Sequence, residues 1–166
     1  MMRFSIVFAL LPLVAAIPTK RVDNRQYIHL QLGSDNGQQL CAGLADASAT
    51  SFSAATCGAG GYGDSDITEL VVLYGVGKSS PLEITSHGCP TSTGASLTGG
   101  SNVPVVDCDI DDQAQFFTVQ EDGTVTNDAT GTCLTLGKAA PGAPLTLSSC
   151  GGDFADKQTF TWSSAV

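Results

Sequence analysis

The chain has 166 residues, of which 42% are hydrophobic and 14% charged, and its formal net charge at pH 7 is −9. This charge disfavours nucleic acid and anionic membranes as partners, because both repel acidic proteins. The length fits one domain with a substantial core, and no apolar run is long enough to span a bilayer.

The first residues have the features of a secretory signal. Residues 1–16 place Arg3 before an apolar run and end in the small residues of a cleavage site after Ala16. Residues 17–26 form a leader whose dibasic Lys20-Arg21 offers a second cut after Arg21. We therefore expect a secreted, extracellular protein with its folded domain over residues 27–166.

The remaining chain is a series of short segments in which apolar and polar residues alternate, the pattern of half-buried strands. In chain order, these segments are residues 27–32, 71–74, 82–84, 103–106, 117–119, 124–126, 133–136 and 145–147. Turn signals such as Asn36-Gly37 and Asp122-Gly123 separate them. No stretch of helical length has both the periodicity and the caps of a helix, so the sequence predicts an all-β protein.

The six cysteines occur as closely spaced couples at near-regular intervals, which indicates an internal repeat. Behind a signal peptide, an even cysteine count implies disulfides, and six cysteines allow about 15 connectivities. The repeat favours the three local pairs among them. These are Cys41 with Cys57, Cys89 with Cys108, and Cys133 with Cys150.

A second motif closes the repeat units. Gln115 begins Gln-Phe-Phe-Thr-Val, and Gln158 begins Gln-Thr-Phe-Thr-Trp, so both units read Gln-x-Phe-Thr followed by an apolar residue. In the first unit residues 69–73 are the best candidate for this motif. The glutamine can bond to loop backbone, while the aromatic residue two positions later points to the same face and fills the core.

The segments 131–135, 144–150 and 158–160 resemble the repeat of the ricin B-type lectin family. The resemblance implies a β-trefoil of three repeat units, each with a local disulfide. Phe117 and Phe160 stand where the family's closing motif has tryptophan. It also implies a non-catalytic carbohydrate-binding protein whose partners are glycans or glycoproteins and which needs no cofactor.

The family's sugar-binding residues are replaced in every unit. The family has a carboxylate after the first cysteine, an aromatic residue before the second, and an asparagine before the closing glutamine. The corresponding residues are Gly43, Ala55 and Thr68 in the first unit, Thr91, Val106 and Ala114 in the second, and Thr135, Ser148 and Lys157 in the third. The sequence therefore predicts degenerate family sites.

Two other groups combine an aromatic ring with carboxylates, which is what a displaced sugar site requires. The first is Asp153, Phe154 and Asp156, close before the closing glutamine of the third unit. The second is Tyr62, Asp64 and Asp66, in a glycine-rich loop of the first unit. We expect binding at one of these groups, and the third unit is favoured because its loop is shorter.

No catalytic or metal site is predicted. The acidic run 107–112 fails the EF-hand pattern, residues 75–79 lack the first glycine of a P-loop, and neither His29 nor His87 accompanies a nucleophile signature. An alternative function is a secreted β-trefoil that acts on proteins, as a protease inhibitor or effector, because one fold serves both uses.

Overall fold

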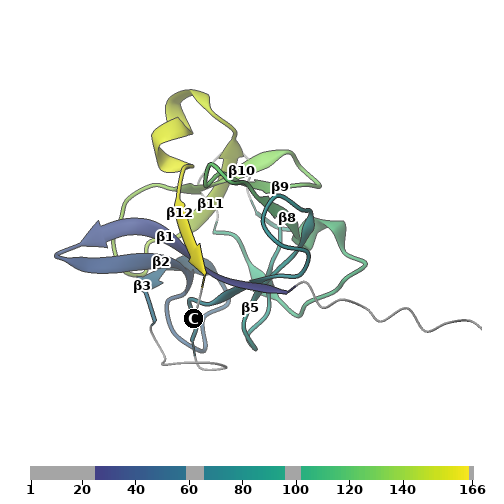
Figure 1. Ribbon diagram of the computed structural model, residues 1–166, viewed down its shortest axis with the longest axis horizontal. Helices are drawn as coiled ribbons and strands as arrows, with labels where there is room; N and C mark the ends of the chain where they lie inside the picture. Colours follow the sequence, from purple (N-terminus) through teal and green to yellow (C-terminus); the bar gives the residue numbers. More distant parts are fainter. Residues whose placement is uncertain (1–24, 59–65, 96–101, 165–166) are drawn as a thin grey trace, which may run out of the picture.

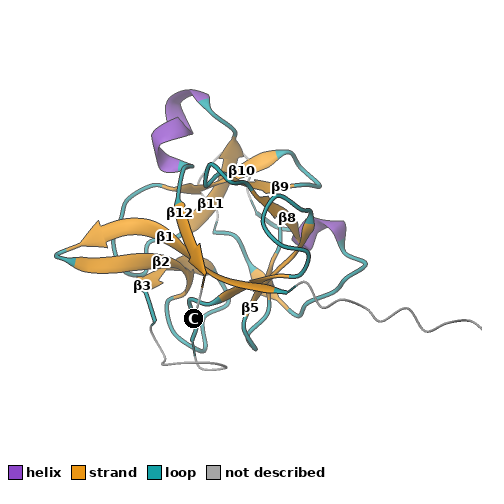
Figure 2. Ribbon diagram, in the orientation of Figure 1, coloured by secondary structure: helices purple, strands orange, loops and turns teal. Residues whose placement is uncertain are grey.

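The computed structural model describes residues 25–58, 66–95 and 102–164. Within these residues the chain forms strands and two short 3-10 helices (Figure 2). The signal peptide predicted at 1–16 and most of the predicted leader lie outside the described residues. The first strand begins at Gln26, so the folded part includes the last residue that the sequence assigned to the leader.

The strands form three units of four. The first unit contains β1 (Gln26–Asp35), β2 (Gln38–Leu44), β3 (Phe52–Thr56) and β4 (Leu70–Val72). The second contains β5 (Ser80–Ile84), β6 (Cys89–Pro90), β7 (Val105–Val106), the 3-10 helix η2 (Gln113–Gln115) and β8 (Phe116–Val119). The third contains β9 (Val125–Asn127), β10 (Thr132–Leu136), β11 (Leu145–Ser149), the 3-10 helix η3 (Gly152–Lys157) and β12 (Thr161–Ser164).

The first and fourth strands of each unit together close a six-stranded barrel. β1 pairs with β4 and β12, β4 with β5, β5 with β8, and β8 with β9. The bridge between Thr124 and Thr159 completes the ring between β9 and the segment that leads into β12. Figure 1 shows the three units following one another around a common centre. A closed barrel with one strand pair added by each unit, β2–β3, β6–β7 and β10–β11, is a β-trefoil, as the sequence predicted.

All three units contribute to one core. Its largest fully buried side chains include Ile28, Leu30, Phe52, Leu82, Phe117, Leu134 and Leu147. Phe117 and Phe160, the aromatic residues of the closing motif, are 1% and 7% exposed and belong to this cluster. Trp162 is half-buried at its edge.

The disulfides join Cys41 to Cys57, Cys89 to Cys108, and Cys133 to Cys150, which confirms the predicted local pairing. Each bridge ties the first strand of an added pair to a residue one or two positions after the second strand ends. One strand prediction was too long: β4 ends at Val72, and Tyr74 lies in the following turn with 59% of its surface exposed. The turn places Tyr74 in solvent because the strand pairing with β1 and β5 has already ended.

Candidate functional site

The closing glutamine of the third unit fastens the loop that carries η3. The Oε1 atom of Gln158 accepts a hydrogen bond from the backbone N–H of Gly151 at 2.8 Å. Its Nε2 atom donates to the carbonyl of Ser149 at 2.9 Å and to Oγ1 of Thr135 at 2.9 Å. Gln158 is 2% exposed, so these bonds satisfy an amide that would be costly to bury alone. The start of η3 is thereby held against β10.

The second unit repeats this arrangement. The Oε1 atom of Gln115 accepts from the N–H of Asp109 at 2.9 Å, and its Nε2 donates to the carbonyl of Asp107 at 3.1 Å. In both units, therefore, the glutamine spans the second cysteine and bonds to the residues on either side of it. This confirms the sequence interpretation of the closing motif.

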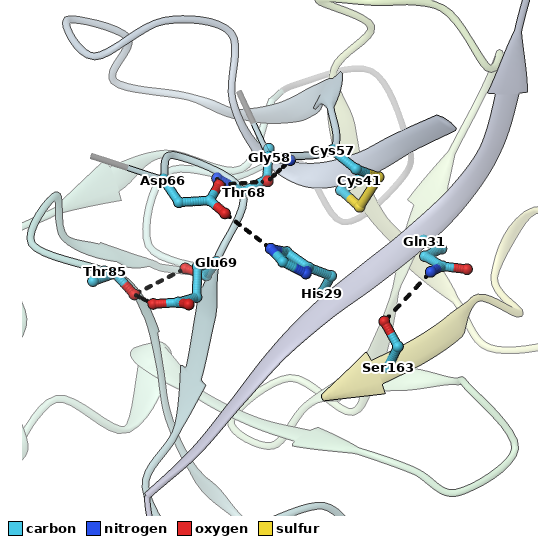
Figure 3. Close-up of polar contacts among 10 residues, drawn as sticks. All are labelled: His29, Gln31, Cys41, Cys57, Gly58, Asp66, Thr68, Glu69, Thr85 and Ser163. Carbon is cyan, nitrogen blue, oxygen red and sulfur yellow. Dashed lines mark hydrogen bonds and ion pairs between the residues drawn. A yellow bond between two sulfur atoms is a disulfide. The ribbon is translucent and has the colours of Figure 1, made fainter. Parts of the chain in front are cut away.

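In the first unit, Thr68 occupies the position of the closing glutamine. Its Oγ1 atom accepts a hydrogen bond at 2.9 Å from the N–H of Gly58, the residue after Cys57 (Figure 3). Leu70, two residues later, is fully buried where the other units have phenylalanine. The predicted closing segment 69–73 was therefore one residue out of register, because a threonine hydroxyl replaces the glutamine amide. The residue before the closing position is Ile67 rather than Thr68.

The corrected register places the backbone of Ile67 beside Gly43, the residue that the resemblance puts at the family's carboxylate position. Leu44 donates its N–H to the carbonyl of Ile67 at 3.0 Å, which brings that carbonyl over Gly43. A Cβ atom at Gly43 would lie 2.1 Å from the Ile67 oxygen, so any side chain at this position would clash with the backbone of Ile67. In the third unit, Thr135 is bonded to Gln158, and Ser148 is 2% exposed. Neither of them presents a carboxylate or a ring.

Asp66 is part of a buried polar network rather than an open site. Its Oδ1 accepts from the N–H and the hydroxyl of Thr68 at 2.8 and 2.7 Å, and its Oδ2 lies 3.0 Å from Nε2 of His29 (Figure 3). Burial acts to raise the pKa of Asp66, but hydrogen bonds from Thr68 and His29 outweigh it and lower the pKa below its usual value. Tyr62 and Asp64, the other members of this group, lie outside the described residues.

The third-unit group lies on η3, which projects from the barrel beside β12 (Figure 1). Asp153, Phe154 and Asp156 are all exposed, and Phe154 shows 38% of its surface. A 3-10 helix has three residues per turn, so residues three apart share a face. Asp153 and Asp156 therefore lie one above the other, while Phe154 and Lys157 form the adjacent face. The exposed ring and the two exposed carboxylates therefore lie on neighbouring faces of one short helix.

A hollow of about 280 Å³ lies where the end of η3 meets the turn between β10 and β11. Asp156 and Lys157 line it from η3, and Lys138 lines it from the turn. Leu32 and Phe160, two residues of the core, also line it. No local sequence pattern marks Lys138, because it comes to line the hollow only when the β10–β11 turn and η3 meet in the fold.

The acidic run of the second unit organises its own loop. Asp112 accepts from the N–H of Ala114 at 3.0 Å and caps η2, while Asp109 accepts from the N–H of Asp111 at 2.9 Å. Over residues 25–58, 66–95 and 102–164, no three His, Cys, Asp or Glu side chains are grouped as a metal site would require. In the same ranges, no helix has the length and apolar character needed to cross a membrane.

Comparisons with known proteins agree with this architecture. Residues 82–165 match the family model described as the ricin-type beta-trefoil lectin domain. No curated protein sequence matches the chain. A designed three-fold symmetric protein, ThreeFoil, is similar in structure, with 19% identity and a TM-score of 0.58 over 81% of this chain and 96% of its own.

Two natural lectin structures share the fold. The Polyporus squamosus lectin, solved with the epitope Neu5Aca2-6Galb1-4GlcNAc, has 11% identity and a TM-score of 0.61, covering 84% of this chain and 49% of its own. The agglutinin from Abrus precatorius has 17% identity and a TM-score of 0.58, covering 90% and 51%. These likenesses show the fold. Together with the family match over half of its length, they show that this chain belongs to the ricin-type β-trefoil lectin domain family.

Proposed function

We propose that this protein is a secreted, non-catalytic carbohydrate-binding module whose site has moved from the family's positions to η3. The observation that carries the proposal is the exposed ring of Phe154 on the helix face next to two exposed carboxylates, Asp153 and Asp156. An aromatic face can cover the apolar face of a sugar ring, and carboxylate oxygens can accept hydrogen bonds from its hydroxyls. Gln158 and the disulfide between Cys133 and Cys150 hold this segment in place.

Membership of the lectin family supports glycans, free or on glycoproteins, as the partners. The family's positions in the first and third units support a displaced site, since Gly43 faces a carbonyl and Thr135 is bonded to Gln158. Secretion is supported by the predicted signal segment and by the three disulfides, which persist in oxidising compartments. We expect weak binding by a single site, because few groups converge there.

A glycan array on the oxidised protein, followed by titration of a responding glycan, tests the proposal. We expect Phe154→Ala to weaken binding about fivefold, since a stacked ring contributes on the order of 1 kcal/mol. Tyr74→Ala, which removes an exposed ring far from η3 along the chain, is the matched control and should bind like wild type. Tyr62→Ala tests the second predicted group. If neither Phe154→Ala nor Tyr62→Ala alters binding, the displaced-site proposal is wrong.

A protein-directed function is the second candidate, as an inhibitor of proteases or an effector. The observation that favours it is Ile110, which is 70% exposed in the acidic loop after Cys108. A large apolar side chain in solvent can become part of the buried centre of an interface with a protein partner. Inhibition of a protease panel that is lost in Ile110→Ala, together with an empty glycan array, would establish this function in place of sugar binding.

A further inference from the structure

The hollow beside η3 brings together two of the chain's seven basic residues, although its net charge is −9. Lys138 extends from the turn between β10 and β11, and Lys157 extends from the end of η3. Both lysines are exposed, and no ion pair joins either of them to a carboxylate in the described part of the chain. Asp156 lines the same space without pairing with them. Two lysines and one aspartate therefore line the hollow.

The hollow differs from the family's sugar position in the third unit. Consecutive residues of a strand point to opposite faces. Thr135 of β10 points to Gln158, whereas the next residue, Leu136, lines the hollow. Lys157 is the one residue shared by the hollow and the family's sugar position in the third unit. The floor is formed by side chains of the core, among them Leu32 and Phe160, whose positions are fixed by packing.

We infer that this hollow is a subsite for a saccharide unit that carries an anionic group, such as a uronic acid or a sulfated sugar. The inference rests on the proposed function and specifies its ligand class. The ammonium groups of Lys138 and Lys157 bind the anionic group from two sides, while Asp156 accepts hydrogen bonds from ring hydroxyls. The volume of about 280 Å³ lies just below the range of pockets that hold drug-sized ligands, which suits one sugar unit.

The net negative charge of the protein does not prevent such binding. Exposed charges farther apart than the Debye length, about 8 Å at physiological ionic strength, interact weakly. An anion in the hollow therefore responds mainly to the lysines, to Asp156 beside it, and to Asp153 one 3-10 turn away from Asp156. The same reasoning predicts that binding weakens as salt concentration rises.

Calorimetric titration of the oxidised, full mature protein tests the inference. The probes are a trisaccharide of galacturonic acid, its neutral methyl ester, a sulfated galactose trisaccharide and inorganic sulfate. We expect at least one acidic trisaccharide to bind about tenfold more tightly than the ester. Lys138→Gln and Lys157→Gln should each weaken this binding about fivefold, as for a partly exposed charge pair. Lys78→Gln, an exposed lysine between β4 and β5, is the matched control and should change nothing.

Equal affinity for the acid and the ester, or unchanged binding in both lysine variants, would overturn the anionic subsite. Neutral glycans that still bind in a Phe154-dependent way would then leave the proposed function intact. Inorganic sulfate that binds as tightly as the acidic trisaccharides would also overturn the inference, because the sugar ring would contribute nothing. If neither neutral nor acidic glycans bind, both the anionic subsite and the proposed carbohydrate-binding function are wrong.

Discussion

Removal of the Gln158 side chain tests how the third unit is held together. Gln158→Ala deletes three hydrogen bonds, to Gly151, Ser149 and Thr135, from a residue that is 2% exposed. Each bond contributes about 1 kcal/mol net, so the free energy of unfolding should fall by about 3 kcal/mol. For a chain of this size, that corresponds to a melting temperature lower by about 6–12 °C.

Urea unfolding under non-reducing conditions measures this loss. Trp162 is the single tryptophan and is half-buried, so its fluorescence reports on the third unit. Gln115→Ala removes two hydrogen bonds and should cost about 2 kcal/mol, less than the Gln158 variant. Gln113→Ala is the matched control, because Gln113 is exposed and its loss should change stability by less than about 0.5 kcal/mol.

The test depends on the order of the stability losses in the three variants, with Gln158→Ala the largest and Gln113→Ala the smallest. A loss below about 1 kcal/mol for Gln158→Ala would mean that water replaces its hydrogen bonds at no cost. An equal loss in Gln113→Ala would mean that the stability change reflects glutamine in general rather than the two closing positions. Either result would refute the view that these amides fasten the loops beside the second cysteines.

Three further predictions follow from other parts of the barrel. Phe160→Ala should destabilise the fold by about 3–5 kcal/mol in the same urea assay, because Phe160 is 7% exposed and a cavity would remain; a loss below about 1 kcal/mol would place Phe160 outside the core. Gly43→Ala should lower the free energy of unfolding by about 1–3 kcal/mol, because its Cβ would lie 2.1 Å from the carbonyl oxygen of Ile67. A melting temperature equal to that of the wild type would contradict this prediction. The lowered pKa of Asp66 adds stability that is fully present above the unfolded pKa of about 3.9 and is lost as pH falls through the lower folded value. Asp66→Asn should therefore flatten the decline in stability below about pH 4. An unchanged pH profile would show that the ionised Asp66 carboxylate, with its bonds to Thr68 and His29, adds no stability.

The sequence by itself determined the repeat and its covalent frame. Each cysteine pair brackets a single strand pair, so the spacing of the two cysteines along the chain reports directly on their closeness in the fold. The two glutamine motifs were also readable, because each residue acts on a loop only a few positions away. Alternation of apolar and polar residues located most strands, since a strand's two faces differ in burial.

Only the tertiary structure decided how the first unit closes and what the third unit presents. Thr68 shares no pattern with Gln158, yet its hydroxyl meets the same backbone position, because hydrogen-bond geometry can be satisfied by different chemical groups. The obstruction at Gly43 arises from the carbonyl of Ile67, which a glycine-rich insertion separates from it in sequence. Lys138 and Lys157 face one hollow because the β10–β11 turn and η3 pack together, and no periodicity within either segment encodes the distance between them.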